Sequence, residues 1–193
     1  SEYVKASQDA SDNLDMSTEA TNAELLKEAI TDEFGVKYSK DGRKLLKAPQ
    51  KLDGTYSIKE GVRIICNNAF SGCFSLKSLV IPDSVTRIGD SAFFCCEFLR
   101  SVVIPDSVTN IGDGAFGYCY SLTSIAIPSS VTSIGEGAFN GCSSLTDIAI
   151  PDSVTSIGDN TFMGCTSLSS LVIPSGVTSI GNRSFYGCTS LSS

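Results

Sequence analysis

The sequence contains no histidine and no tryptophan, and it has only 2 methionines among its 193 residues. Without histidine, the chain cannot assemble a Ser-His or Cys-His nucleophilic pair, and no C-x-x-C knuckle offers zinc a site. No apolar run reaches the roughly 18 residues that would span a membrane. These absences argue against catalysis and bilayer insertion, and we expect a protein that is not an enzyme and needs no cofactor or metal.

Positive charge is also scarce, because 14 Lys and Arg residues stand against 21 Asp and Glu residues, for a net charge of −7. Binding to nucleic acid needs clustered cations, so an acidic chain is a poor candidate. The one contrary stretch is 37–63, where eight basic residues accompany three acidic ones. A solvated hairpin whose lysines protect a sheet edge explains this stretch better, and we expect no nucleic-acid partner.

What the sequence has in abundance is one motif. The stretch 76–98, LKSLVIPDSVTRIGDSAFFCCEF, returns at a fixed period of 23 residues, which predicts a solenoid. Apolar residues alternate at the start of each copy until a proline ends the first strand. The S-V-T-x-I stretch predicts a second strand, which a glycine ends. We therefore expect a repeat solenoid with short parallel β-strands on two faces of each 23-residue coil.

The residues before the repeats are expected to close the first coil. The T-N-A-E pattern that starts at Thr21 is a capping box, and the apolar spacing after it predicts a helix over about 22–33. This helix is expected to dock on the open end of the solenoid. Asp41-Gly42 predicts a type I′ turn between strands near 35–39 and 43–47.

The predicted organisation follows the chain in order. A flexible acidic tail at 1–20 precedes an N-terminal helix and β-hairpin cap at 21–51. The solenoid occupies 52–193, with a degenerate first coil at 52–75, five full repeats at 76–190 and the start of a sixth. Since the chain opens without a leader and stops as a repeat begins, we expect a processed product of a longer protein.

The repeat L-x-x-[LIV]-x-I-P-x-S-V-T-x-I-G-x-x-A-F-x-x-C-x-x closely resembles the BspA-like class of leucine-rich repeats over roughly 52–193. The resemblance implies a leucine-rich-repeat solenoid in a cell-surface or secreted, extracellular protein. It also implies adhesion to host proteins, host cells or other microbes, with no shared catalytic residues. The interpretation is a non-catalytic protein-binding module, and the alternative is a structural spacer that displays another domain absent from this chain.

Six of the eight cysteines occupy one column of the repeat. Stacked parallel side chains have poor geometry for a disulfide, and cysteine is often a small buried hydrophobe, so we expect buried free thiols in this column. Cys66 and Cys95 fall outside it, and Cys95 is expected to be reactive if exposed. The column contains Cys73, Cys96, Cys119, Cys142, Cys165 and Cys188.

A second column is acidic and contains Asp90, Asp113, Glu136 and Asp159, continued by Asn182. Carboxylates stacked about 4.8 Å apart could collect Ca²⁺, which favours several oxygen ligands. The column also stands just before the A-F dipeptide, where an aspartate can cap a short helical turn. We favour the capping role.

The clearest departure from the repeat is a group of aromatic residues around the Phe/Cys turn, where other copies have glycine, asparagine or serine. Exposed aromatics on a repeat scaffold are candidate binding residues, although they could instead fold back over the turn and extend the core. The candidate partner-binding residues are Phe74, Phe94, Phe98, Tyr118 and Tyr120.

Two further surfaces are candidates for contact with a partner. The outward positions of the first strand of each copy form a ribbon of small residues, which suits a flat partner or another copy of the chain. The C-terminal coil has no cap in this sequence, so end-to-end or side-by-side self-association through it is a further expectation.

Overall fold

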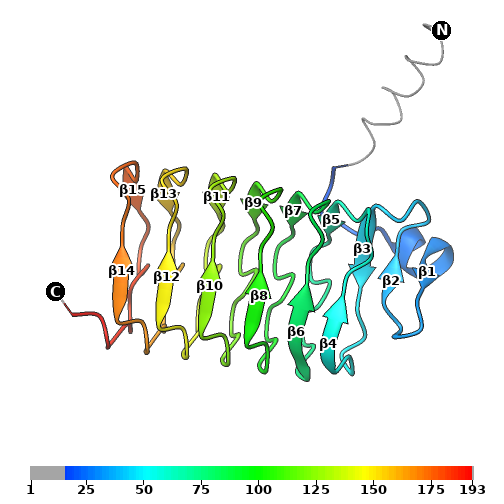
Figure 1. Ribbon diagram of the computed structural model, residues 1–193, viewed down its shortest axis with the longest axis horizontal. Coiled ribbons are helices and arrows are strands. Elements are labelled where there is room, and N and C mark those ends of the chain that lie inside the picture. Colours follow the sequence, from blue (N-terminus) through cyan, green and yellow to red (C-terminus); the bar gives the residue numbers. More distant parts are fainter. Residues whose placement is uncertain (1–15, 193) are drawn as a thin grey trace, which may run out of the picture.

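The computed structural model describes residues 16–192, which form one row of stacked coils (Figure 1). Each full coil carries one short strand on each of two faces. On the first face, six parallel strands lie side by side in the order β14-β12-β10-β8-β6-β4. We call this the first sheet; its strands are β4 (Gly54–Ser57), β6 (Leu76–Val80), β8 (Ser101–Val103), β10 (Ser124–Ala126), β12 (Asp147–Ala149) and β14 (Ser170–Val172).

The other face carries a second sheet in the order β1-β2-β3-β5-β7-β9-β11, and the pair β13-β15 follows it along the row. Its first two strands are antiparallel to their neighbours, and the others run parallel. The strands are β1 (Ile30–Thr31), β2 (Lys37–Tyr38), β3 (Lys44–Lys47), β5 (Ile64–Ile65), β7 (Arg87–Ile88), β9 (Asn110–Ile111), β11 (Ser133–Ile134), β13 (Ser156–Ile157) and β15 (Ser179–Ile180).

The repeat period sets the register of both sheets. Ile125 pairs with Ile148 in the first sheet, and Ile88 pairs with Ile111 in the second, so each residue meets its own counterpart in the next copy. Side chains of one kind therefore form columns through the core. The solenoid with short parallel strands on two faces, predicted from the period, is confirmed.

A ladder of phenylalanines runs through the core. The rings of neighbouring coils are stacked nearly parallel, with centroids 5.0 Å apart for Phe93 and Phe116 and 5.6 Å apart for Phe116 and Phe139. Phe70 through Phe162 are fully buried, and each such ring contributes about 1.5–3 kcal/mol through burial. Because each ring is covered by the rings of adjacent coils, one coil cannot bury its core alone.

The cysteine column lies beside this ladder, and all eight cysteines are free thiols. Each column thiol donates a hydrogen bond to a backbone carbonyl of the preceding coil, as Cys96 Sγ does to Phe70 O at 3.2 Å. The predicted buried thiols are confirmed for five positions, while Cys188 in the last coil is half-exposed. Burial raises the pKa of Cys73 to about 11 and that of Cys165 to about 12.

The N-terminal helix is shorter than predicted. The capping box forms, since Glu24 N donates to Thr21 Oγ1 and Thr21 N donates to Glu24 Oε2. The helical turn η1 (Glu24–Glu28) then ends, and residues 30–31 form strand β1 instead of continuing the predicted helix to 33. Asp32 explains the change: its Oδ1 accepts the N–H groups of Phe34 and Val36, and this local turn competes with helix.

The helical turn also docks elsewhere than expected. Leu25 and Ala29 pack on the outer side of the second sheet, against Leu46, Ile64 and Cys66, and not on the open end of the solenoid. The strands β1 and β2 and the turn between them lie at that end (Figure 1).

The end itself is closed by the residues after β1. Val36 and Tyr38 are buried in the main core, and Phe34 packs edge-on against Tyr56 of the first coil at 5.7 Å. The Tyr56 hydroxyl donates to Asp32 Oδ2 at 2.6 Å and also contacts the hydroxyl of Tyr38.

The hairpin forms where it was predicted, as β2 and β3, but its turn is different. A type I′ turn needs positive φ at both central residues, and of the two predicted central residues only Gly42 has one, at 73°. Gly42 N donates to Ser39 O at 2.9 Å, so Lys40 and Asp41 occupy an ordinary turn and Gly42 follows in the left-handed region.

Residues 16–20, predicted to belong to a flexible tail, lie along the second sheet; residues 1–15 of that tail lie outside the described residues. Asn67 N donates to Thr18 O at 2.7 Å, and Arg87 Nη1 donates to Met16 O at 3.1 Å. Within 16–192, no helix has the length and hydropathy needed to cross a bilayer.

The second sheet is interrupted between β11 and β13. Elsewhere a glycine N–H after the strand donates to an isoleucine carbonyl of the preceding coil, as Gly135 N does to Ile111 O and Gly181 N to Ile157 O. Among the described residues, Gly158 makes no such bond. A Cβ atom on Gly158 would lie 3.3 Å from its nearest neighbour, against 2.4 Å on Gly135 or Gly181, so the coils are further apart here.

Candidate functional site

Three of the five predicted aromatic residues come together across the Phe/Cys turns of two successive coils. Phe94 and Tyr118 meet edge to face with centroids 5.2 Å apart, and Tyr118 meets Tyr120 in the same way at 6.1 Å. Edge-to-face pairs of this kind are worth about 0.5–1.5 kcal/mol beyond their buried area. We call Phe94, Tyr118 and Tyr120 the aromatic cluster.

Two rings of the cluster are anchored on glycines of the next coil. A Cβ atom on Gly117 would lie 2.9 Å from Phe94 Cδ2, and one on Gly141 would lie 2.6 Å from Tyr118 Cδ1. Phe94 and Tyr118 are half-buried by this packing, whereas Tyr120 is 43% exposed. The cluster is therefore held by its inner rings and presents Tyr120 to solvent.

The other two predicted residues flank the cluster without joining it. Phe74 is 44% exposed and Phe98 is 52% exposed, and no ring contact among the described residues links either one to the cluster. Phe74 and Tyr120 belong to one column of the repeat, with Glu97 between them. The surface around the cluster thus combines exposed rings with one carboxylate.

The backbone under the cluster has an unfavourable conformation. Cys95 and Tyr118 both have φ of 57°, in the left-handed region. The same position holds glycine in every other coil, at Gly72, Gly141, Gly164 and Gly187, again with positive φ. A side chain in this region costs about 1–2 kcal/mol, which glycine avoids. Sequence comparison shows the substituted column but does not reveal the sign of φ.

Ionisation of Tyr120 and of Cys95 is disfavoured at the site. Burial raises the pKa of Tyr120, and Cys95, Glu97 and Tyr118 raise it further. Burial and then Glu97 raise the pKa of the Cys95 thiol. Since the thiolate is the nucleophile, a raised pKa disfavours the reactivity considered for Cys95. The site offers rings, hydroxyl groups and a thiol for contact.

One exposed aromatic residue was missed by the sequence analysis. Tyr186 is 71% exposed and occupies the repeat column of Phe94, in the last described coil. Aligning the column would have found it, because the other copies have Ser71, Gly117, Asn140 and Met163 there.

The acidic column has a structural role that differs in detail from the predicted cap. Asp90 Oδ1 accepts the N–H of Asp113 at 2.9 Å, and Asp113 Oδ1 accepts the N–H of Glu136 at 2.8 Å. Each aspartate thus caps the next coil and not its own turn. Glu136, one methylene longer, makes no such bond to Asp159 in the described structure.

The acidic column gives no support to the calcium alternative. Nowhere in residues 16–192 do three or more His, Cys, Asp or Glu side chains gather to hold a metal ion.

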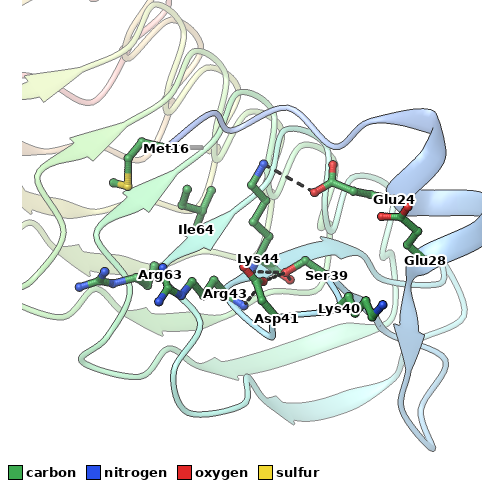
Figure 2. A pocket seen from close by; sticks show the side chains of 10 residues that line it. All are labelled: Met16, Glu24, Glu28, Ser39, Lys40, Asp41, Arg43, Lys44, Arg63 and Ile64. Carbon is green, nitrogen blue, oxygen red and sulfur yellow. Dashed lines mark hydrogen bonds and ion pairs between the residues drawn. The ribbon is translucent and has the colours of Figure 1, made fainter. Parts of the chain in front are cut away.

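A cavity lies away from the cluster, between the N-terminal segment and the hairpin (Figure 2). It has a volume of 490 Å³, and Met16 and Ile64 provide its apolar wall. Three of its charged side chains have partners within the site: Lys44 Nζ lies 3.7 Å from Glu24 Oε1, and Asp41 accepts hydrogen bonds from Ser39 Oγ and Arg43 N. The cavity follows from how the N-terminal segment docks and was not predicted.

Comparison with known proteins decides the family. The family model described as "BspA type Leucine rich repeat region" matches residues 63–192 in 6 copies. The chain belongs to this family. No curated protein matches the sequence.

Solved structures agree with membership of the BspA-type family. A leucine-rich cell surface protein from Faecalibacterium prausnitzii shares 35% identity over 79% of this chain, with a TM-score of 0.72, and this chain spans 41% of its length. The T. pallidum leucine-rich repeat protein shares 28% identity, with a TM-score of 0.71 and coverage of 90% of this chain and 91% of that one. The pneumococcal vaccine antigen PcpA, at 22% identity and a TM-score of 0.67, shares the fold; the match covers 80% of this chain and 42% of PcpA.

Proposed function

We propose that this chain is a non-catalytic binding module of a cell-surface or secreted protein, which adheres to host or microbial proteins. The aromatic cluster is the proposed contact site, together with the flanking Phe74 and Phe98. Membership of the BspA-type family supports an interaction role, and the F. prausnitzii relative is described as a cell surface protein.

The observation that carries the proposal is the left-handed backbone of Cys95 and Tyr118. Strained non-glycine residues persist where the side chain has a use, and such residues concentrate at functional sites. Four other coils reach the same conformation with glycine, so the solenoid itself does not need these side chains. Tyr118 in turn supports Tyr120, its exposed neighbour in the cluster.

The shape of the site favours a macromolecular partner. Tyr120, Phe98 and Phe74 are each about half exposed on the outside of the turn, where they can be covered by an opposing surface. Tyrosine and phenylalanine anchors of this kind carry much of the energy of protein interfaces. A small-molecule site would be concave with convergent polar groups, and the cavity beside the N-terminal segment lies elsewhere.

The test replaces each residue with the one that another coil carries at the same position. A triple variant with Phe98→Ser, Tyr118→Gly and Tyr120→Ser copies Ser144, Gly141 and Ser143. Its binding to immobilised matrix proteins, mucins and microbial surface proteins is compared with that of the parent by surface plasmon resonance. Tyr186→Asn serves as the control, because it removes an exposed aromatic residue outside the cluster.

We expect the triple variant to lose at least about tenfold in affinity for whichever protein the parent binds, with Tyr186→Asn unchanged. Equal binding by the parent and a well-folded triple variant would show that the aromatic cluster is not the contact site. The spacer alternative gains support if this chain binds nothing while a longer natural protein does; the chain spans only 41% of the F. prausnitzii relative, which keeps that alternative open.

End-to-end association through the last described coil, expected from the sequence, stays a proposal. Ile180 is 51% exposed, whereas its counterpart Ile157 in the preceding coil is 2% exposed. Ile180→Ser is therefore the variant that tests association through this end, and a change in sedimentation coefficient is the measurement.

A further inference from the structure

The outer side of the first sheet carries a continuous apolar row that nothing in the described chain covers. The strands β6, β8, β10, β12 and β14 lie side by side (Figure 1), and each has an exposed apolar residue at the same repeat position. Val80 is 53% exposed, and Val103 and Val172 are each 75% exposed. We call this set the valine row; it comprises Val80, Val103, Ala126, Ala149 and Val172.

The valine row is accessible because the side chains beside it on the outer face of the sheet are small. The other outward position of the same strands is serine in four coils and Asp147 in the fifth. No ring or long aliphatic chain stands on the face between β8 and β14. Another sheet could therefore approach to the usual distance of about 10 Å between packed sheets.

Basic residues lie on one side of the valine row and acidic residues on the other, each three residues along the chain from a valine of the row. Lys77 and Arg100 each stand three residues before a valine of the row, and Asp83 and Asp106 each stand three residues after one. All four are exposed. Arg100, Asp83 and Asp106 form no ion pair among the described residues, and Lys77 has only an exposed pair with Asp53 at 3.5 Å.

We propose that two copies of this chain pack first sheet against first sheet, about a two-fold axis that runs along the valine row. Such an axis places each strand antiparallel to the same strand of the partner copy, and the valine row against itself. The column of Lys77 and Arg100 then faces the column of Asp83 and Asp106 in the other copy. Lys77 meets Asp83 and Arg100 meets Asp106, and symmetry produces each pair twice.

The charge pattern is what identifies a second copy as the occupant. A surface that carries basic residues on one side of an axis and acidic residues on the other is complementary to itself after a two-fold rotation. The opposite arrangement, with the axis along β10, would set Asp106 against Asp152 and is disfavoured by repulsion between like charges.

The size of the surface sets the expected strength. Five strands about 4.8 Å apart, with about 20 Å between the charged flanks, correspond to roughly 400 Å² on each partner. The total of roughly 800 Å² is below the roughly 1,200–2,000 Å² of stable interfaces, so the dimer is expected to be weak, and to dissociate as salt rises.

Sedimentation velocity over a concentration series, at low and high salt, tests the proposal on the intact chain. Val103→Asp places a charge in the row and is expected to abolish the dimer. Arg100→Asp and Asp106→Arg each set like charges opposite one another, and each is expected to weaken the dimer about tenfold. The double variant with both changes reverses the pair and should restore the parental dissociation constant.

Arg63→Asp is the charge-matched control, since Arg63 is exposed beside the second sheet. The proposal is overturned if the parent is monomeric at all concentrations, or if the double variant fails to recover while remaining folded by circular dichroism. A dimer that resists Val103→Asp but is lost in Ile180→Ser would assign the contact to the C-terminal coil instead. Variants of the aromatic cluster should still form dimers, which separates this proposal from the proposed function.

Discussion

The ring of Tyr118 lies over Gly141 of the next coil, where a Cβ atom would come within 2.6 Å of Tyr118 Cδ1. The two residues occupy the same repeat position in successive coils, and both have positive φ. A side chain at position 141 would therefore collide with the ring of Tyr118. The glycine at position 141 thus leaves room for the ring of Tyr118.

Gly141→Ala is expected to destabilise the fold and displace Tyr118. The new methyl group meets the ring and also suffers the left-handed backbone, which alone costs about 1–2 kcal/mol. Gly164→Ala is the matched control, because its φ is also 73° but a Cβ atom there would lie 3.6 Å from its nearest neighbour. Urea unfolding should show a larger loss for Gly141→Ala, and equal losses would contradict the ring contact.

Cys95→Gly is expected to stabilise the protein. The substitution relieves a positive φ at a position that glycine occupies in four other coils. A gain of about 1 kcal/mol corresponds to a rise of about 2–4 °C in the Tm of a chain of this size. Differential scanning calorimetry measures the shift, and a lower Tm would show that the Cys95 side chain makes contacts that outweigh the strain.

Asp113→Ala is expected to cost about 1–2 kcal/mol of unfolding free energy. The side chain accepts the N–H of Glu136 at 2.8 Å, and its loss leaves that donor without its charged acceptor. Asp113→Asn keeps an acceptor oxygen and should recover part of the stability. Chemical denaturation of the two variants distinguishes the hydrogen bond from a general effect of the charge.

Glu136→Asp is expected to stabilise the protein by about 1 kcal/mol. Aspartate at this position can cap the next coil as Asp90 and Asp113 do, and should draw β13 into the second sheet. Amide hydrogen exchange at Gly158 and Asp159 should slow. Unchanged exchange in a folded variant would mean that the longer side chain is not what interrupts the sheet.

Stability is expected to fall as the pH rises above about 9. Burial raises the pKa of Cys73 to about 11 and that of Cys165 to about 12, from an ordinary value near 9. The unfolded chain therefore loses these protons first, so the stabilising contribution is complete below about pH 9 and is lost as the pH approaches the folded values. Urea unfolding at pH 8 and pH 10 measures the change, which should be smaller in Cys165→Ala.

The solenoid could be predicted from the sequence because the same apolar pattern recurs in every 23-residue copy. Leu, Ile, Phe and Cys each recur at one position of the period, so the register of Ile125 on Ile148 and the buried cysteine column follow from counting. The aromatic residues could be picked out in the same way, as exceptions within columns. The strain beneath Cys95 and Tyr118 could not, since the sign of φ depends on the geometry of the turn.

The N-terminal cap was harder to predict because it is not repeated. Asp32 ends the helix through side-chain hydrogen bonds to Phe34 and Val36, and an apolar spacing pattern does not reveal that competition. The docking of Leu25 on the outside of the second sheet depends on Leu46 and Ile64, which interrupt the outward polar positions there. Such long-range contacts have no signature in local sequence.

The interruption of the second sheet between β11 and β13 makes the interface between these two coils weaker than the others. In a linear array, stability is a sum over coils and the interfaces between neighbours, so loading or heating first opens the weakest interface. Where Gly158 lacks its bond to the preceding coil, the array is expected to part into a segment that ends with β11 and one that begins with β13. Under tension, this protein would then yield in two steps, and the coils that carry the aromatic cluster would remain with the longer, N-terminal piece.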